Sequence, residues 1–164
     1  MCIPKITPFL WFDNQAEEAA KFYVSVFKKS KIGKITRYGK EGYEFHKIPE
    51  GKVMTIEFQI EGQKFTALNG GPVFNFNGGI SFVVNCENQE EVDYYWKKLS
   101  KGGDEKAQMC GWLKDKYGMS WQVIPTVLIK MLQDKDKKKA GSVMNAMLQM
   151  KKIDIKKLKQ SFEQ

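Results

Sequence analysis

The chain has 164 residues, enough for one domain or for two half-size modules that share a core, and its 42% hydrophobic and 13% aromatic residues exclude a disordered chain. No apolar run approaches the roughly 20 residues of a membrane-spanning helix, and no apolar leader follows the first residues, so we expect a cytoplasmic protein without a membrane partner. The three cysteines, an odd number without CxxC spacing, argue against a disulfide framework and against a thiolate zinc site.

The net charge of +8 is concentrated in the last part of the chain. Residues 126–164 contain ten lysines and four acidic residues, so this segment carries +6 of the total. A basic segment can attract nucleic acid or acidic partners. Here the lysines alternate with apolar residues at helical spacing and no arginine accompanies them. A solvated helix face is therefore favoured, and nucleic-acid binding is not expected.

The first elements in chain order are a strand and a helix. Residues 3–12 are predicted to form a buried strand. Asn14 then offers an N-cap, with Glu17 at the spacing of a capping box, for a helix whose apolar stripe runs to Phe27. Residues 31–38 are predicted to be the next strand, and a glycine-rich connection follows.

A strand pair completes the first half. Residues 53–61 alternate between apolar and polar, which predicts a strand in a sheet with unlike faces. Glu61-Gly62 is predicted to be a tight turn, and residues 64–69 return as another strand. Residues 70–79 have the composition of a linker.

The second half begins with the same signals. Residues 80–86 are predicted to form a strand, and Asn88 with Glu91 repeats the capping box of a helix that ends at Gly102-Gly103. Residues 107–114 and 119–125 are predicted strands on either side of a turn. The pattern after Pro125 predicts three short helices, over residues 126–133, 137–150 and from 154 onward.

The two halves are copies of one unit. An offset of 74 residues relates Ile6, Thr7, Asn14, Gln15 and Glu17 to Ile80, Ser81, Asn88, Gln89 and Glu91. A second offset, of 56, relates Gly62, Phe65 and Leu68 to Gly118, Trp121 and Ile124, so the second copy is 18 residues shorter in its middle. Such a repeat predicts two copies of one strand–helix module.

Two βαβββ copies in one short chain resemble the vicinal-oxygen-chelate superfamily of glyoxalases, bleomycin-resistance proteins and extradiol dioxygenases. Phrases such as Cys-Gly-Trp-Leu-Lys-Asp-Lys-Tyr-Gly-Met-Ser-Trp-Gln and Met-Leu-Gln-Met-Lys-Lys-Ile-Asp-Ile are similar to its PhnB-like branch, often labelled the 3-demethylubiquinone-9 3-methyltransferase family. The resemblance implies an α+β fold with βαβββ modules at residues 1–72 and 79–125, a helical extension at 126–164, a cup enclosed by curved sheets, and a homodimer.

The resemblance also implies where a metal would bind. In the superfamily's enzymes, His, Glu or Gln on the first and last strand of each module bind a divalent metal, and the matching positions here are Pro8, Thr66, Phe82 and Gln122. Only Gln122 has a suitable donor, whereas a catalytic metal needs about three. The single histidine, His46, lies in the variable hairpin region. We therefore predict a cup without metal or other cofactor.

The candidate ligand-binding residues are an amide and several aromatic rings. Gln122 could orient a ligand, or it could hydrogen-bond within the sheet. Trp112, with Phe82, could form a stacking wall for a flat molecule. Strand parity puts Trp11 and Trp121 on the face opposite Gln122, where they are expected to pack against helices. Thr66 occupies the matching last-strand position of the first module.

Three further residues are weaker candidates. Asn69 precedes two glycines and could present backbone amides to a ligand, although a turn is the favoured explanation of this sequence. Glu57 could be a general base if it is buried, and it is otherwise a solvated strand residue. Cys110 could be a nucleophile only beside an activating base or dipole.

Three kinds of function remain open at this point. The first is binding of a small organic or aromatic molecule, the second is an enzyme that acts through Gln122 and Glu57, and the third is an interaction protein that uses the helical extension. The methyltransferase label is treated as a family name, because no glycine-rich strand-to-helix turn of a methyl-donor fold occurs in the sequence.

Overall fold

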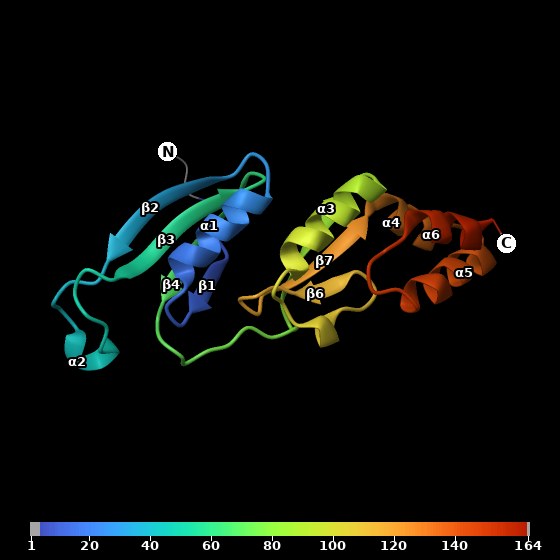
Figure 1. Cartoon of the computed structure of the whole chain (residues 1–164). Helices are drawn as coiled ribbons and strands as arrows, with labels where there is room; N and C mark the ends of the chain where they lie inside the picture. Colours follow the sequence, from blue (N-terminus) through green and yellow to red (C-terminus); the bar gives the residue numbers. More distant parts are fainter. Residues whose placement is uncertain (1–3, 164) are drawn as a thin grey trace. The chain divides into compact units, whose positions relative to one another are not determined.

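The computed structural model describes residues 4–163 and divides into two compact units, Met1–Asn75 and Phe76–Gln164, each with its own sheet (Figure 1). Both units combine one mixed sheet with helices, which confirms the predicted α+β class. In the described part of the chain, no helix is both long and apolar enough to cross a membrane.

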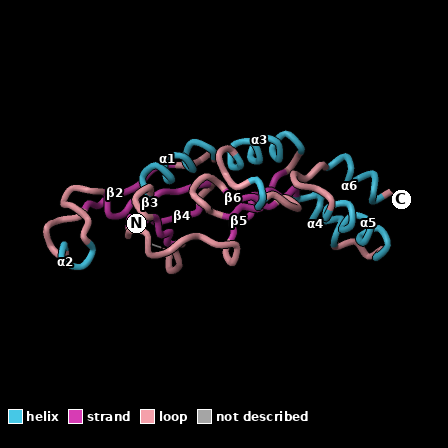
Figure 2. Tube along the Cα trace, turned by 60° about the horizontal axis from the view of Figure 1, so that its bottom comes forward, coloured by secondary structure: helices cyan, strands magenta, loops and turns pink. Residues whose placement is uncertain are grey.

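The first unit is a four-stranded sheet in the order β1-β4-β3-β2 with one helix against it. β1 pairs with β4 in parallel and the other neighbours are antiparallel. Its elements are β1 (Phe9–Phe12), α1 (Ala16–Val26), β2 (Lys31–Arg37), the short α2 (Tyr43–His46), β3 (Val53–Ile60) and β4 (Gln63–Asn69). Figure 2 shows α1 lying along the strands of this sheet.

Alternation along β3 produces the predicted two-faced sheet. Ile56, Phe58 and Ile60 are buried, and Phe58 stacks on Phe65 and on Tyr23 of α1 with centroid distances of 5.2 and 6.1 Å. Glu61 and Gly62 both have positive φ, 45° and 86°, as a two-residue hairpin turn that follows the twist of the strands requires.

The predicted N-cap of the first helix is wrong. α1 begins at Ala16 after Gln15, and the side chain of Asn14 forms no hydrogen bond among the described residues. Instead Asn69, at the end of β4, accepts a bond from the Ala16 amide at 2.8 Å and donates to the Val53 carbonyl at 3.0 Å. A neighbouring strand therefore caps this helix, which a local sequence pattern cannot reveal.

The sheet of the second unit has three strands in the order β5-β7-β6. Its elements are β5 (Ser81–Cys86), α3 (Gln89–Ser100), the 3-10 helix η1 (Glu105–Ala107), β6 (Trp112–Lys114) and β7 (Ser120–Pro125). The predicted capping box is confirmed here, because Asn88 accepts from the Glu91 amide at 2.9 Å and Glu91 accepts from the Glu87 amide at 2.8 Å. Within residues 76–163 no strand corresponds to β2, so the described elements of this module follow the order βαββ instead of the expected βαβββ.

The strand register confirms the sequence repeat. Phe9 pairs with Thr66 between β1 and β4, and Val83 pairs with Gln122 between β5 and β7. These two pairs are related by the offsets of 74 and 56 residues found in the sequence. The same row of residues can therefore be compared between the two sheets.

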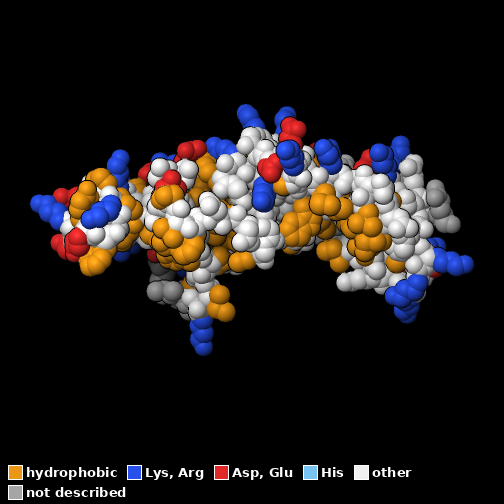
Figure 3. Space-filling model, turned by 90° about the horizontal axis from the view of Figure 1, so that it is seen from below, with side chains coloured by type: hydrophobic (Ala, Val, Ile, Leu, Met, Phe, Trp, Pro, Cys, Tyr) orange, Lys and Arg blue, Asp and Glu red, His pale blue; other side chains and the backbone are white. Residues whose placement is uncertain are grey.

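Three helices follow β7 and belong to the second unit. They are α4 (Thr126–Leu132), α5 (Lys137–Leu148) and α6 (Ile155–Phe162). They enclose a small core of their own, formed by Leu128, Met131, Val143, Ile153 and Leu158. All ten lysines of this segment are exposed, as the solvated-face interpretation requires, and Figure 3 shows lysine side chains projecting at the C-terminal end.

Candidate functional site

Each sheet has a face that its helix does not cover, which we call the open face. On the open face of the second unit, Gln122 in β7 is paired with Val83 of β5 on one side and Trp112 of β6 on the other. Side chains directly opposite each other on paired strands point to the same face. Val83 is 48% exposed, and Trp112 and Gln122 are half-buried. An amide is thus flanked by an indole and an apolar side chain.

The Gln122 amide is held in place by a hydroxyl. Its Nε2 donates to Ser81 Oγ at 2.9 Å. Among residues 4–163, nothing donates a hydrogen bond to its Oε1, so this oxygen can accept one from a ligand. The structure thus shows the hydrogen bond within the sheet, and orientation of a ligand by Gln122 stays a prediction. The sequence did not identify Ser81 as part of this site.

The equivalent row in the first unit is Phe9, Thr66 and Glu57. Phe9 is 59% exposed and Thr66 is half-buried. Glu57 is exposed, so the burial that a general base would need is missing. A Cβ on Gly33 would lie 3.0 Å from the Cβ and 3.2 Å from the backbone oxygen of Glu57, closer than most side chains pack.

Phe82 does not share a face with Gln122. Its ring lies 5.6 Å from that of Trp121 on the helix side of the sheet, and the Trp121 indole donates to Asp115 at 2.8 Å. The first-strand positions expected from the sequence, Pro8 and Phe82, therefore lie one residue away from the residues that face Thr66 and Gln122, which are Phe9 and Val83. Because successive strand residues point to opposite faces, this single step moves both side chains away from the open face.

Trp11 also departs from its expected position, whereas Trp121 packs on the helix side as predicted. Trp11 lies on the open face of the first sheet, because its neighbours Leu10 and Phe12 are buried against the helix. Its ring meets Phe74 edge-on at 5.0 Å and its indole donates to the Gly71 carbonyl at 2.8 Å. Any Cβ on Gly70 would lie within 2.6 Å of the ring.

Asn69 has a structural role. It is only 8% exposed, and both ends of its side-chain amide are bound to the start of α1 and to β3. Its backbone carbonyl accepts a bond from the Tyr38 hydroxyl at 2.6 Å. The Gly70 and Gly71 amides donate to the Phe12 and Asp13 carbonyls at 2.9 and 3.1 Å, so the backbone amides that the sequence suggested for a ligand are bound within the unit.

The two described cysteines differ in their surroundings, and the nucleophilic role considered for Cys110 stays a prediction. Burial raises the pKa of the Cys86 thiol to about 12, which keeps it protonated near neutral pH. Cys110 is half-buried in a tight turn with φ 50°. Cys2 lies outside the described residues.

No group of three His, Cys, Asp or Glu side chains in residues 4–163 lies close enough together to hold a metal ion. Both ring nitrogens of His46 are engaged by its own loop, since Nδ1 accepts from the Ile48 amide at 3.0 Å and Nε2 lies 3.2 Å from the Glu41 carbonyl. On the open face of the second sheet, Ser81 and Gln122 offer only neutral oxygens, which are weak ligands for a catalytic divalent ion.

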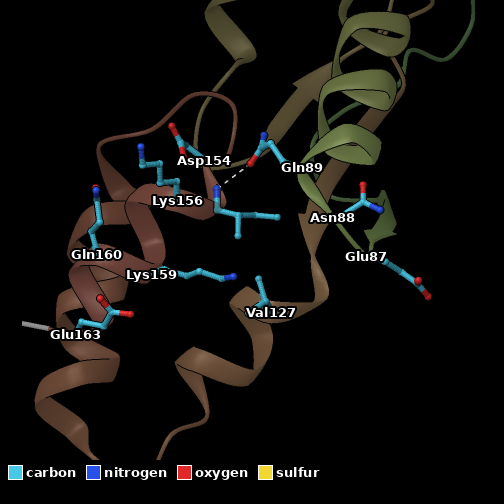
Figure 4. A pocket seen from close by; sticks show the side chains of 10 residues that line it. Glu87, Asn88, Gln89, Val127, Asp154, Lys156, Lys159, Gln160 and Glu163 are labelled. Atoms are coloured by element: carbon cyan, nitrogen blue, oxygen red, sulfur yellow. Dashed lines mark hydrogen bonds between the residues drawn. The ribbon is translucent and has the colours of Figure 1, made fainter.

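A groove lies elsewhere in the second unit, between the start of α3, α4 and α6 (Figure 4). Its volume is about 710 Å³, within the range of ligand pockets. Lys159 points into it toward Val127, and both acidic and basic side chains surround it. None of the residues singled out from the sequence as site candidates lines it. Gln89 closes one end through a hydrogen bond to the Ile155 amide.

The 3-demethylubiquinone-9 3-methyltransferase family model matches residues 4–124. Among solved structures, the chain is 37% identical to the PhnB protein of Bacillus cereus, whose assignment as a 3-demethylubiquinone-9 3-methyltransferase is provisional. The similarity covers 75% of this chain and 100% of that one, with a TM-score of 0.63. A Staphylococcus aureus protein is 32% identical over 74% of this chain and 96% of its own, with a TM-score of 0.34. A Pseudomonas aeruginosa protein shares the fold at 20% identity over 75% and 98%, with a TM-score of 0.58. No curated protein matches the chain.

Proposed function

Because the chain belongs to the PhnB-like 3-demethylubiquinone-9 3-methyltransferase family, we propose that it binds a small, flat aromatic molecule on the open face of its second sheet, without a metal ion or other cofactor. The observation that carries this proposal is the row formed by Val83, Gln122 and Trp112. An indole beside an apolar side chain suits a flat apolar body, and the amide between them can fix its orientation.

The free Gln122 oxygen narrows the ligand class. One N–H of Nε2 is bound to Ser81, so the amide offers a ligand its Oε1 acceptor and the second N–H. A ring that carries a hydroxyl or N–H group would satisfy this acceptor while stacking against Trp112. A ring with only acceptor groups would leave the amide oxygen without a partner and would bind more weakly.

An enzymatic role has less support from the site. Gln122 has no titratable proton, Glu57 is exposed, and Cys110 belongs to no cluster of three His, Cys, Asp or Glu side chains in residues 4–163. Methyl transfer also lacks the glycine-rich strand-to-helix turn of the usual methyl-donor fold. A non-catalytic binder, by analogy with the resistance proteins of the vicinal-oxygen-chelate superfamily, therefore accounts for the residues better than glyoxalase or dioxygenase chemistry.

We further propose that the protein is a cytoplasmic homodimer. β1 and β5 are edge strands, and the equivalent residues Ile6 and Ile80 just before them are 86% and 73% exposed. Proteins usually protect exposed apolar edges, and a second copy of the chain would cover these. Light scattering should give the mass of a dimer, and Ile80→Lys should shift the balance toward monomer. A monomeric wild-type protein would overturn this part of the proposal.

The binding proposal is tested with 2-naphthol and 2-methoxynaphthalene, in which a methyl group replaces the hydroxyl proton and removes the donor. Calorimetry should detect tighter binding of 2-naphthol by the wild-type protein. Gln122→Leu should abolish this preference, and Trp112→Leu should weaken both probes. Trp96→Leu, a change on α3, is the matched control. No saturable binding of either probe, or equal binding by the Trp112 variant, would refute the proposal.

A further inference from the structure

Trp112 follows a two-residue turn whose backbone conformation is unusual. The Met109 and Trp112 amides and carbonyls bond to each other at 3.1 and 2.7 Å, so Cys110 and Gly111 form the tip. Both tip residues have positive φ, 50° and 84°. Residues with a side chain rarely adopt this conformation, and Cys110 needs surrounding contacts to hold it there.

Those contacts come from two segments. In β7, the Val123 amide donates to the Gly111 carbonyl at 2.8 Å. The other segment is the connection between α5 and α6 together with the first residue of α6, residues 149–155, which we call the strap. The Cys110 amide donates to the Met150 carbonyl at 2.7 Å, and the Gly111 amide donates to the Lys151 carbonyl at 2.8 Å. Any Cβ on Gly111 would lie 3.2 Å from the side chain of Ile153. The strap thus binds both outward amides of the turn and packs directly against its glycine.

The strap is in turn fixed to α3. Gln89 donates to the Ile153 carbonyl at 3.1 Å and accepts from the Ile155 amide at 2.8 Å (Figure 4). Lys152 forms an ion pair with Asp93 in the next turn of that helix. Ile153 itself is fully buried in the core of the C-terminal helices. The strap therefore connects the start of α3 to the turn before Trp112.

We infer that the strap positions Trp112 for ligand binding, which makes the C-terminal helices part of the binding machinery although the family match ends at residue 124. Trp112 leaves the turn directly into β6, where it is paired with Gln122. Releasing the strap removes the partners of the Cys110 and Gly111 amides, so the turn is held by β7 alone and the indole is less firmly placed beside the Gln122 amide. The inference rests on the proposed function for its ligand, whereas the contacts of the strap are tested without one.

The test compares Gln89→Met with Gln160→Met. Gln89→Met keeps the length of the side chain and removes its bonds to the strap. Gln160→Met alters an exposed glutamine whose side chain makes no hydrogen bond within residues 4–163. Losing these bonds should speed amide exchange at Cys110 and Gly111 about tenfold. The indole signal of Trp112, assigned with Trp112→Phe, should shift only in the Gln89 variant. Unchanged exchange and an unchanged indole signal would overturn the inference.

A second measurement separates this inference from the proposed function. The affinity for 2-naphthol should fall several-fold in Gln89→Met and stay at the wild-type value in Gln160→Met. If the wild-type protein does not bind 2-naphthol, the proposed function fails while the exchange experiment still decides the role of the strap. If Gln89→Met does not fold, Asp93→Asn removes the surface ion pair of the strap, and the same exchange and indole criteria apply to it.

Discussion

Replacing Asn69 with alanine should lower the free energy of unfolding of the first unit by about 2 to 3 kcal/mol. Loss of the cap on α1 accounts for about 1 kcal/mol of this figure. The rest comes from the Val53 carbonyl, which loses its donor, at roughly 1 to 2 kcal/mol. Because the site is only 8% exposed, water cannot replace either bond easily.

Two matched variants make the reasoning specific. Asn69→Asp keeps an acceptor for the Ala16 amide and loses the donor to Val53, so it should fall between wild type and Asn69→Ala. Asn14→Ala changes the residue that the sequence pattern indicated as the cap, and it should cost less than about 0.5 kcal/mol.

The assay should follow the first unit directly. A urea titration monitored through the backbone NMR signals of α1 reports its unfolding even if the two units unfold separately. A loss of stability in Asn14→Ala equal to that in Asn69→Ala would refute the cross-strand cap. A small effect of Asn69→Ala would show that the two buried bonds add little.

Three other changes test separate parts of the structure. Burial raises the pKa of Cys86 from 9.0 to about 12, so this thiol loses its proton at lower pH in the unfolded chain than in the folded protein. The free energy of unfolding should therefore fall between pH 9 and 12, by up to about 1.4 kcal/mol per pH unit. Urea titrations across this range should show a weaker dependence of stability on pH in Cys86→Ala. Asp115, 2% exposed, accepts from two backbone amides and the Trp121 indole, so Asp115→Ala should cost about 3 kcal/mol or more in urea unfolding, or prevent folding of the second unit. Thr66→Gln should reproduce in the first unit the amide–hydroxyl bond seen in the second, with Thr7 supplying the hydroxyl. The NMR signal of the new side-chain NH₂ should move toward that of a free amide when Thr7→Val is added. An identical signal in the single and double variants would contradict the equivalence of the two rows.

The elements of the fold could be predicted because their signals are local and occur twice. Alternation along β3, the Glu61-Gly62 turn and the capping box at Asn88 all depend on residues within a few positions of one another. The cap of α1 depends on a residue 53 positions away, and no local pattern contains it. The repeat explains why the two helices differ. The position equivalent to Asn69 in the second copy is Pro125, which has no side-chain amide, so α3 must use its own Asn88.

The candidate site was predicted only in part because it depends on which face each strand residue takes. Gln122 and Trp112 were assigned to one face correctly, since both are fixed by the last hairpin. Phe82 was assigned through an alignment of first strands, where an error of one residue reverses the face. The sequence did contain a signal for the correct face, namely the hydroxyl that recurs at Thr7 and Ser81. This hydroxyl is kept at the same repeat position, whereas the next residue changes from proline to phenylalanine. A small polar residue that recurs at the same place in two otherwise apolar strands has little reason to be there unless it meets a polar partner, and in the second unit that partner is Gln122.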